Sequence, residues 1–188
     1  MKKTDLVLAL DPGKEFYAWA VVRGDGTVID TGMIKNLVND FSYLHFGRQV
    51  AGYTREIQAL LAAHEYFAVV AERFQIRGMS TAGETCEFVN LMLGILVAHA
   101  RLLPYRVAID LQPATMWKSW LGRLAYGDAG AIENSPDVFG YPQVTKQTSK
   151  RKVRGVFPIK EHQFDAMCLG VWFAARETYS LTNVDDLE

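Results

Sequence analysis

The sequence predicts an α/β fold in which a mixed five-stranded sheet carries helices on both faces. Near the start, Gly24-Asp25-Gly26 separates two strand-like runs and is a strong hairpin signal. Further along, apolar runs alternate with segments of helical periodicity. Hairpins make antiparallel strands and strand–helix–strand crossovers make parallel ones, so we expect three antiparallel strands followed by two parallel ones.

The first three strands are predicted from short apolar runs bounded by turn residues. Residues 6–10 form a continuous apolar run that ends at Asp11-Pro12-Gly13, which is typical of a buried central strand. Two further strand-like runs cover residues 17–23 and 27–35.

The rest of the chain predicts two more strands and four helices. The spacing of apolar residues predicts these elements, and Pro158, which favours a first helical turn, marks the start of the last helix. In order they are a helix over 49–65, a strand over 67–71, a helix over 82–102, a strand over 105–111, and helices over 113–124 and 159–178.

Length and composition predict a single domain over residues 1–188. The chain is 49% hydrophobic, but no apolar run approaches the roughly 20 residues that span a bilayer, so we expect no membrane. The basic start leads into an apolar run broken by Asp5, which favours a core strand over a signal peptide. Cys86 and Cys168 have no metal-site spacing and are expected to be free thiols in a reducing cytoplasm.

The segment over about 126–157 is the least regular part of the chain. Its second half, residues 146–154, carries five basic residues and no acid, although the net charge of the chain is −1. A long loop inside a compact domain is usually functional or disordered. Its position just before the last helix favours a functional loop that closes over a cleft, with a solvated flexible loop as the alternative.

Three carboxylates are predicted to converge. Asp11 ends the first strand, Glu72 ends the fourth, and Asp165 lies early in the last helix, three residues after His162. Sites in such sheets form beyond the carboxyl ends of strands. Acids gathered there would repel one another unless cations were bound, and oxygen ligands favour Mg²⁺ or Mn²⁺. Two ions about 4 Å apart would suit phosphodiester hydrolysis.

Each of these residues also has a structural interpretation. Asp11 could only form the turn before Pro12, Glu72 could pair with Arg73, and His162 could be a packed or surface histidine. Asp165 is the strongest candidate because it interrupts an almost wholly apolar helix, where an uncompensated carboxylate would be costly. Capping does not explain it if the helix begins near Pro158.

Together, Leu-Ala-Leu-Asp-Pro-Gly, Val-Val-Ala-Glu-Arg-Phe and His-Gln-Phe-Asp-Ala resemble the active-site segments of RuvC-type Holliday junction resolvases. The family belongs to the RNase H-like, retroviral-integrase superfamily, and the resemblance covers roughly residues 4 to 178. It implies that Asp11 bridges two Mg²⁺ ions, which Mn²⁺ could replace. Glu72 would hold one ion and Asp165 the other, and His162 would ligate a metal or orient the attacking water.

The resemblance also implies branched DNA, above all a four-way junction, as the partner. Gly94 resembles a family glycine that permits close packing, and Lys118 a phosphate-binding lysine. The family has an aromatic residue three positions after the glutamate, whereas Phe74 lies two positions after Glu72. The loop over about 126–157 is also longer than in the bacterial family members. The chain therefore looks like a phage-type, divergent member acting in a bacterial cytoplasm. The expected DNA-binding residues are Arg73, Phe74, Arg77, Lys118, Lys146, Lys150, Arg151, Lys152 and Arg154.

A junction is nearly two-fold symmetric, so we expect a homodimer. Its seam is placed on the helix over 82–102, at Phe88, Leu91, Met92, Ile95 and Leu96. Three other functions stay open. They are a flap or fork nuclease with relaxed specificity, a non-catalytic nucleic-acid-binding module, and an actin-like ATPase, for which the chain is short. The part that Glu161 plays is also open.

Overall fold

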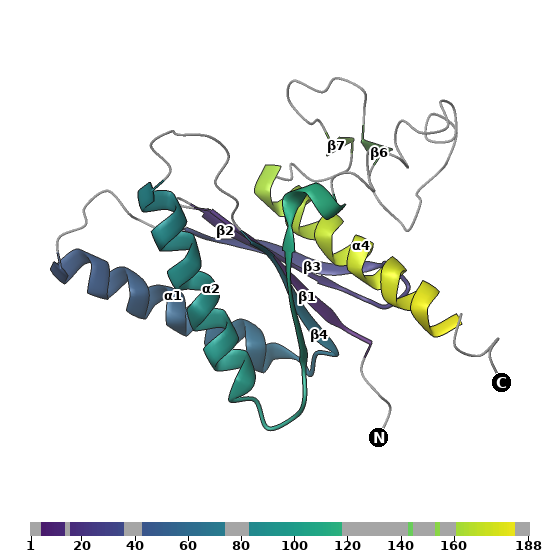
Figure 1. Ribbon diagram of the computed structural model, residues 1–188, viewed down its shortest axis with the longest axis horizontal. Helices are drawn as coiled ribbons and strands as arrows, with labels where there is room; N and C mark the ends of the chain where they lie inside the picture. The colour runs from purple at the N-terminus through teal and green to yellow at the C-terminus, as the bar shows by residue number, and fades with distance from the viewer. Residues whose placement is uncertain are drawn as a thin grey trace.

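A five-stranded mixed sheet with helices on both faces forms the body of the computed structural model (Figure 1). The structure describes residues 5–13, 16–35, 43–73, 83–117, 143–144, 153–154 and 161–182. The strand order is β3-β2-β1-β4-β5. β1 pairs antiparallel with β2 and parallel with β4, so the predicted fold class is confirmed.

The strands of this sheet are β1 (Val7–Pro12), β2 (Phe16–Val22), β3 (Val28–Lys35), β4 (Ala68–Arg73) and β5 (Ala108–Pro113). The helices are α1 (Tyr43–Ala63), α2 (Gly83–Arg101) and α4 (Glu161–Thr182), and residues 114–117 are also helical. Two short strands, β6 (Gln143–Val144) and β7 (Val153–Arg154), pair antiparallel within the predicted long loop, the remainder of which lies outside the described residues.

The predicted hairpin forms between β2 and β3. Gly26 has a φ of 87°, a backbone conformation that residues with a Cβ rarely adopt. The turn is closed by a hydrogen bond from the Thr27 amide to Oδ1 of Asp25, at 2.8 Å. This bond lowers the pKa of the Asp25 carboxyl. The local sequence therefore accounts for the antiparallel start of the sheet.

The two faces of the sheet are covered by different helices (Figure 1). Leu8 and Leu10 of β1 lie in the core on the α1 and α2 side, whereas Val7 and Ala9 lie in the core beneath α4. Side chains alternate between faces along a strand, and β1 is buried on both. The continuous apolar run that predicted a central strand reflects this double burial.

Helix α4 lies unusually close to the sheet. A Cβ built at Gly170 would be 2.6 Å from Cγ2 of Val22 and 3.0 Å from Cβ of Ala9. Because Gly170 has no side chain, the backbone of α4 packs directly against the Val22 and Ala9 side chains. The close contact holds the start of α4 over the carboxyl-terminal end of β1.

The boundaries of several elements differ from the prediction. α1 begins at Tyr43 instead of residue 49, and the added turns include Gly47, a weak helix former. β5 begins at Ala108 instead of residue 105, and the Tyr105 side chain contacts the segment between α1 and β4. Its hydroxyl donates to the His64 carbonyl (3.1 Å) and accepts from the Tyr66 amide (3.3 Å). The predicted helix over 113–124 is described only over 114–117.

The proposed dimer seam on α2 is largely wrong. Phe88, Met92 and Leu96 are buried in the core of the same chain, and Ile95 packs against that core, because α2 covers the sheet and also contacts α1. Only Leu91, at 36% exposure, remains exposed among the five residues. The close packing expected at Gly94 does not occur against the described residues of this chain, since a Cβ there would meet nothing within 4 Å.

The prediction of free cysteines is confirmed. Cys86 and Cys168 are both free thiols, with Cys168 buried and Cys86 partly exposed. Across the helices that the structure describes, none has the length and hydropathy needed to cross a bilayer.

Candidate active site

Asp11 and Glu72 lie side by side on neighbouring parallel strands. Ala9 of β1 is aligned with Val70 of β4, and both side chains are buried in the core beneath α4. The pairing ends at Leu10 and Ala71, so Asp11 and Glu72 are the next residues of the two strands, and strand alternation directs both to the face that carries Ala9 and Val70. Neighbouring strands are about 4.8 Å apart. The sheet therefore brings together the two strand-borne carboxylates that the sequence singled out.

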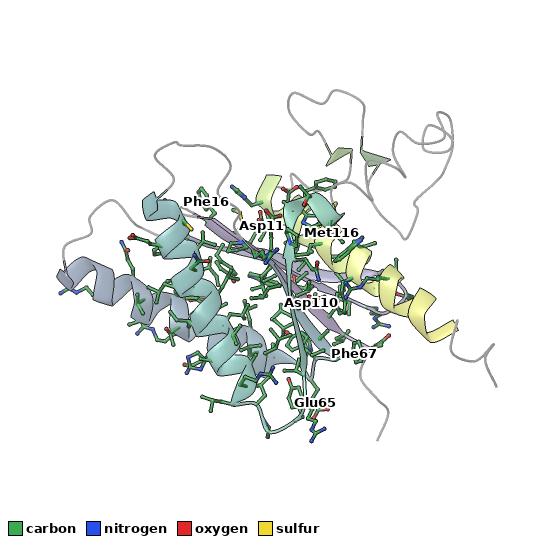
Figure 2. The ribbon with its side chains drawn as sticks, viewed as in Figure 1. Asp11, Phe16, Glu65, Phe67, Asp110 and Met116 are labelled. Atoms are coloured by element: carbon green, nitrogen blue, oxygen red, sulfur yellow. The ribbon has the colours of Figure 1, made fainter. Side chains whose placement is uncertain are left out.

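His162 contacts Asp11 directly. Its Nδ1 lies 2.9 Å from Oδ2 of Asp11, and this contact joins the first turn of α4 to the end of β1. Figure 2 shows Asp11 beside the start of that helix. An ionised carboxylate can only accept, so Nδ1 carries the proton in this bond. In the neutral ring Nε2 then holds the lone pair, which is the form that ligates a metal.

The surroundings of His162 position its ring. The Phe16 ring, at the start of β2, lies with its centroid 6.4 Å from the His162 centroid. A Cβ at Gly13 would be 3.7 Å from Cε1 of His162, so the turn after β1 also approaches the ring. The His162 side chain is 47% exposed although its partner Asp11 is buried. His162 therefore lies at the edge of the site, between buried carboxylate and solvent.

Asp165 is buried one helical turn beyond His162. Asp165 is 5% exposed and Asp11 is 6% exposed. In the described part of the chain, these two are the buried charged side chains. Asp165 is the fifth residue of α4, too far into the helix to act as its N-cap. The capping explanation is therefore excluded, as the sequence indicated.

Glu72 has a partner that the sequence did not reveal. The indole Nε1–H of Trp117 donates to Oε2 of Glu72 over 3.1 Å. Neighbouring residues of a strand point to opposite faces, so the alternative pairing of Glu72 with Arg73 is not supported. Trp117 follows β5 by four residues, and nothing in its local sequence marks it as a partner of an acid on another strand.

The donor set suits a hard divalent cation. Carboxylates with one imidazole are ligands that Mg²⁺ and Mn²⁺ accept, and burial of two carboxylates favours a nearby positive charge. Within the ranges that the structure describes, however, no three His, Cys, Asp or Glu side chains are close enough to hold an ion. The chemistry of the residues fits a metal, while the structure does not show a closed coordination shell.

Most predicted DNA-binding residues lie outside the described part of the chain. Arg73 is described and exposed at the end of β4. The backbone of Arg154 belongs to β7, but its side chain is not described, and the same is true of the Glu161 side chain in α4. The residues outside the described ranges are Phe74, Arg77, Lys118, Lys146, Lys150, Arg151 and Lys152.

Solved structures of junction resolvases share the fold of this chain. A Thermus thermophilus RuvC structure in complex with a Holliday junction substrate superimposes with a TM-score of 0.60 at 18% identity, covering 92% of this chain and 95% of that one. A second Thermus thermophilus RuvC structure gives a TM-score of 0.57 at 18% identity, with 92% and 96% coverage. The chain has the fold of a RuvC-type resolvase.

A eukaryotic structure extends the comparison. The yeast mitochondrial Holliday junction resolvase Ydc2 matches with a TM-score of 0.58 at 12% identity, covering 98% of this chain and 85% of that one. No protein-family model and no curated protein matches the sequence. The likeness to RuvC-type resolvases, and with it the RNase H-like fold class, is therefore confirmed through structure at low sequence identity.

Proposed function

We propose that this chain is a divalent-metal-dependent endonuclease that resolves Holliday junctions or cuts other branched DNA. One observation carries the proposal. Asp11 and Glu72 directly follow the last paired residues of the parallel strands β1 and β4, and His162 of α4 contacts Asp11. Such a group of acids on a RuvC-type resolvase fold is suited to phosphodiester hydrolysis.

In this proposal Asp11, Glu72, His162 and Asp165 hold two Mg²⁺ ions, for which Mn²⁺ can substitute. The ions, when bound, would activate the attacking water and neutralise charge on the leaving oxygen. The protein supplies rigid positions for the ligands. Asp11 is fixed on the central strand, and the proton on Nδ1 of His162 holds its carboxylate. Burial of Asp11 and Asp165 keeps bulk water from the carboxylates.

The DNA would run across the carboxyl end of the sheet. Arg73 is exposed next to Glu72, and the basic segment over 146–154 precedes α4 in the chain. Positive charges beside an acidic site supply the phosphate contacts that dominate nucleic-acid affinity. A homodimer would present two sites to a symmetric junction. We further propose that the protein is a phage-type member of this group and acts in a bacterial cytoplasm.

The proposal is tested with Asp11→Asn and Asp165→Asn on a synthetic four-way junction. We expect both variants to lose cleavage in Mg²⁺ while they still bind the junction in Ca²⁺. Asp5→Asn is the matched control, because Asp5 is an exposed acid just before β1. Undiminished cleavage by either site variant would contradict the mechanism. Junction binding without cleavage by the wild type would instead indicate a non-catalytic binding module.

Relaxed specificity for flaps and forks is the second candidate, since it uses the same residues. Phe74 is displaced by one position from the place of the family's aromatic residue, which favours this alternative. Paired, symmetric nicks in opposite strands of the junction would support resolution. Single nicks, with equal rates on flaps and forks, would support the second candidate.

A further inference from the structure

Trp117 is a buried residue with one polar atom. The side chain is 1% exposed, and its indole Nε1–H can donate a hydrogen bond but cannot accept one. A buried indole N–H almost always has an acceptor, because leaving it unpaired is costly. Here the acceptor is Oε2 of Glu72, at 3.1 Å. The single polar group of the Trp117 side chain therefore donates its hydrogen bond to a proposed metal ligand.

The fold explains how Trp117 reaches this carboxylate. Glu72 of β4 is aligned with Gln112 of β5, and β5 ends one residue later at Pro113. The chain then turns into the helical residues 114–117, visible in Figure 1 directly after β5. This turn brings Trp117 back over the end of β4. The contact depends on the parallel pairing of β4 with β5 and on the direction of the turn.

The ring of Trp117 belongs to a core that also contains the supports of the other site residues. The same buried cluster holds Ala9, two residues before Asp11, and Phe164, next to Asp165. Val70, two residues before Glu72, completes the link. Packing from three elements leaves the indole little freedom, so the direction of its N–H bond is set by the core.

We infer that Trp117 is a positioning residue that orients the Glu72 carboxylate for metal binding. The inference rests on the proposed metal-dependent function and concerns how one ligand of that site is held. Flexible carboxylates must adopt one orientation to ligate an ion, and a fixed N–H donor selects it. Partners of this kind, one step removed from the metal, typically change metal affinity or activity by about 10–100-fold.

The competing explanation is that Trp117 only fills space in the core. Phenylalanine separates the two, because it keeps an aromatic ring and removes the N–H. The chain also offers a matched control in Trp172, a buried tryptophan of the same cluster whose ring lies 4.9 Å from the Arg176 guanidinium. Trp172→Phe therefore removes an indole from the same core without touching Glu72.

The experiment measures Mn²⁺ binding to the full chain without DNA, by electron paramagnetic resonance or calorimetry. We expect Trp117→Phe to raise the Kd for Mn²⁺ about 10–100-fold. We expect Trp172→Phe to leave this Kd within about twofold of the wild type, because it alters only packing. An unchanged Kd in Trp117→Phe, or an equal increase in both variants, would overturn the inference.

The wild-type protein provides a second measurement that does not depend on a variant's folding. The indole ¹⁵N–¹H resonance of Trp117 should shift during a Mg²⁺ titration, while that of Trp172 should not. No shift for Trp117 at saturating Mg²⁺ would overturn the inference. A wild type that binds neither Mg²⁺ nor Mn²⁺ would overturn the proposed function itself, and the two failures are thereby distinguished.

Discussion

Nδ1 of His162 and Oδ2 of Asp11 lie 2.9 Å apart, which joins a helix to a strand that is 151 residues distant in the sequence. Asp11 is buried and His162 is half exposed. The imidazole therefore has one nitrogen committed to the carboxylate and an exposed position from which the other can act. This arrangement suits a residue that both holds Asp11 and ligates a metal or orients water.

Substitution of His162 by two different amides tests this double role. His162→Asn keeps an N–H group near the Nδ1 position and lacks a group at Nε2, whereas His162→Gln preserves the Nε2 position alone. Since both nitrogens are needed in our proposal, we expect each variant to cleave about 10–100-fold more slowly. Single-turnover cleavage of a four-way junction in Mg²⁺ measures the effect.

The matched control for these variants is His64→Asn, an exposed histidine after α1. Its cleavage rate should equal that of the wild type. Full activity of His162→Asn would show that His162 serves only to hold Asp11. Full activity of His162→Gln would show that the contact with Asp11 is dispensable.

Removal of the Asp165 charge should abolish the thermal stabilisation that metal binding gives the protein. Binding of Mn²⁺ at 100 times its Kd stabilises a folded protein by about 2.7 kcal/mol, which corresponds to a rise in Tm of roughly 5–10 °C for a chain of this size. We expect this rise in the wild type and its loss in Asp165→Asn. Thermal unfolding followed by circular dichroism, with EDTA as the reference, measures both. An equal rise in the variant would remove Asp165 from the ligand set.

Much of the fold follows from local patterns in the sequence. The Asp25-Gly26 turn specifies an antiparallel hairpin, and alternation of apolar runs with helical periodicity specifies the parallel crossovers. The placement of Asp11 and Glu72 near strand ends, and of Asp165 in α4, was predictable for the same reason. Each depends on the type of one element and on its end, which local sequence determines.

The features that the sequence did not reveal depend on how separate elements meet. The contact between Trp117 and Glu72 requires the register of β5 on β4, which no local pattern encodes. The apolar face of α2 suggested a dimer seam, but Met92 and Leu96 are buried within the chain, because α2 covers the sheet and also contacts α1. Counting apolar residues on a helix does not tell which neighbour covers them.

Arg176 should contribute to stability without affecting cleavage. Its guanidinium lies 2.7 Å from Oδ2 of Asp110 and 4.9 Å from the centroid of the Trp172 ring. Both partners of the ion pair are partly exposed, at 40% and 24%, so solvent screening limits the pair to about 0.5–1 kcal/mol. With the lost ring contact, Arg176→Ala should lower the free energy of unfolding by about 1–2 kcal/mol.

Urea denaturation in EDTA measures this loss, with Arg176→Lys as the conservative comparison. Arg176 lies roughly 20 Å along the helix axis from His162, so the cleavage rate should not change. A slower rate at unchanged stability would mean that the far end of α4 takes part in the site.

Two glycine-to-alanine substitutions should have opposite effects on stability. At Gly170 the new methyl group would meet Val22 at 2.6 Å and Ala9 at 3.0 Å, which forces α4 away from the sheet. Overpacking costs about 1–3 kcal/mol, partly offset by the helix preference of alanine, so we expect a net loss of about 1–2 kcal/mol. Because α4 carries His162 and Asp165, cleavage should slow as well.

Gly94 provides the matched control because it also lies inside a helix, but a Cβ there meets nothing within 4 Å. Alanine should therefore stabilise the monomer by about 0.5–1 kcal/mol through helix propensity alone. Urea denaturation of both variants, at a concentration where light scattering shows a monomer, tests the contrast. A loss of stability in Gly94→Ala that grows with protein concentration would instead show that α2 packs closely against a second copy at this glycine, since only a neighbour absent from the isolated chain could meet the added methyl group.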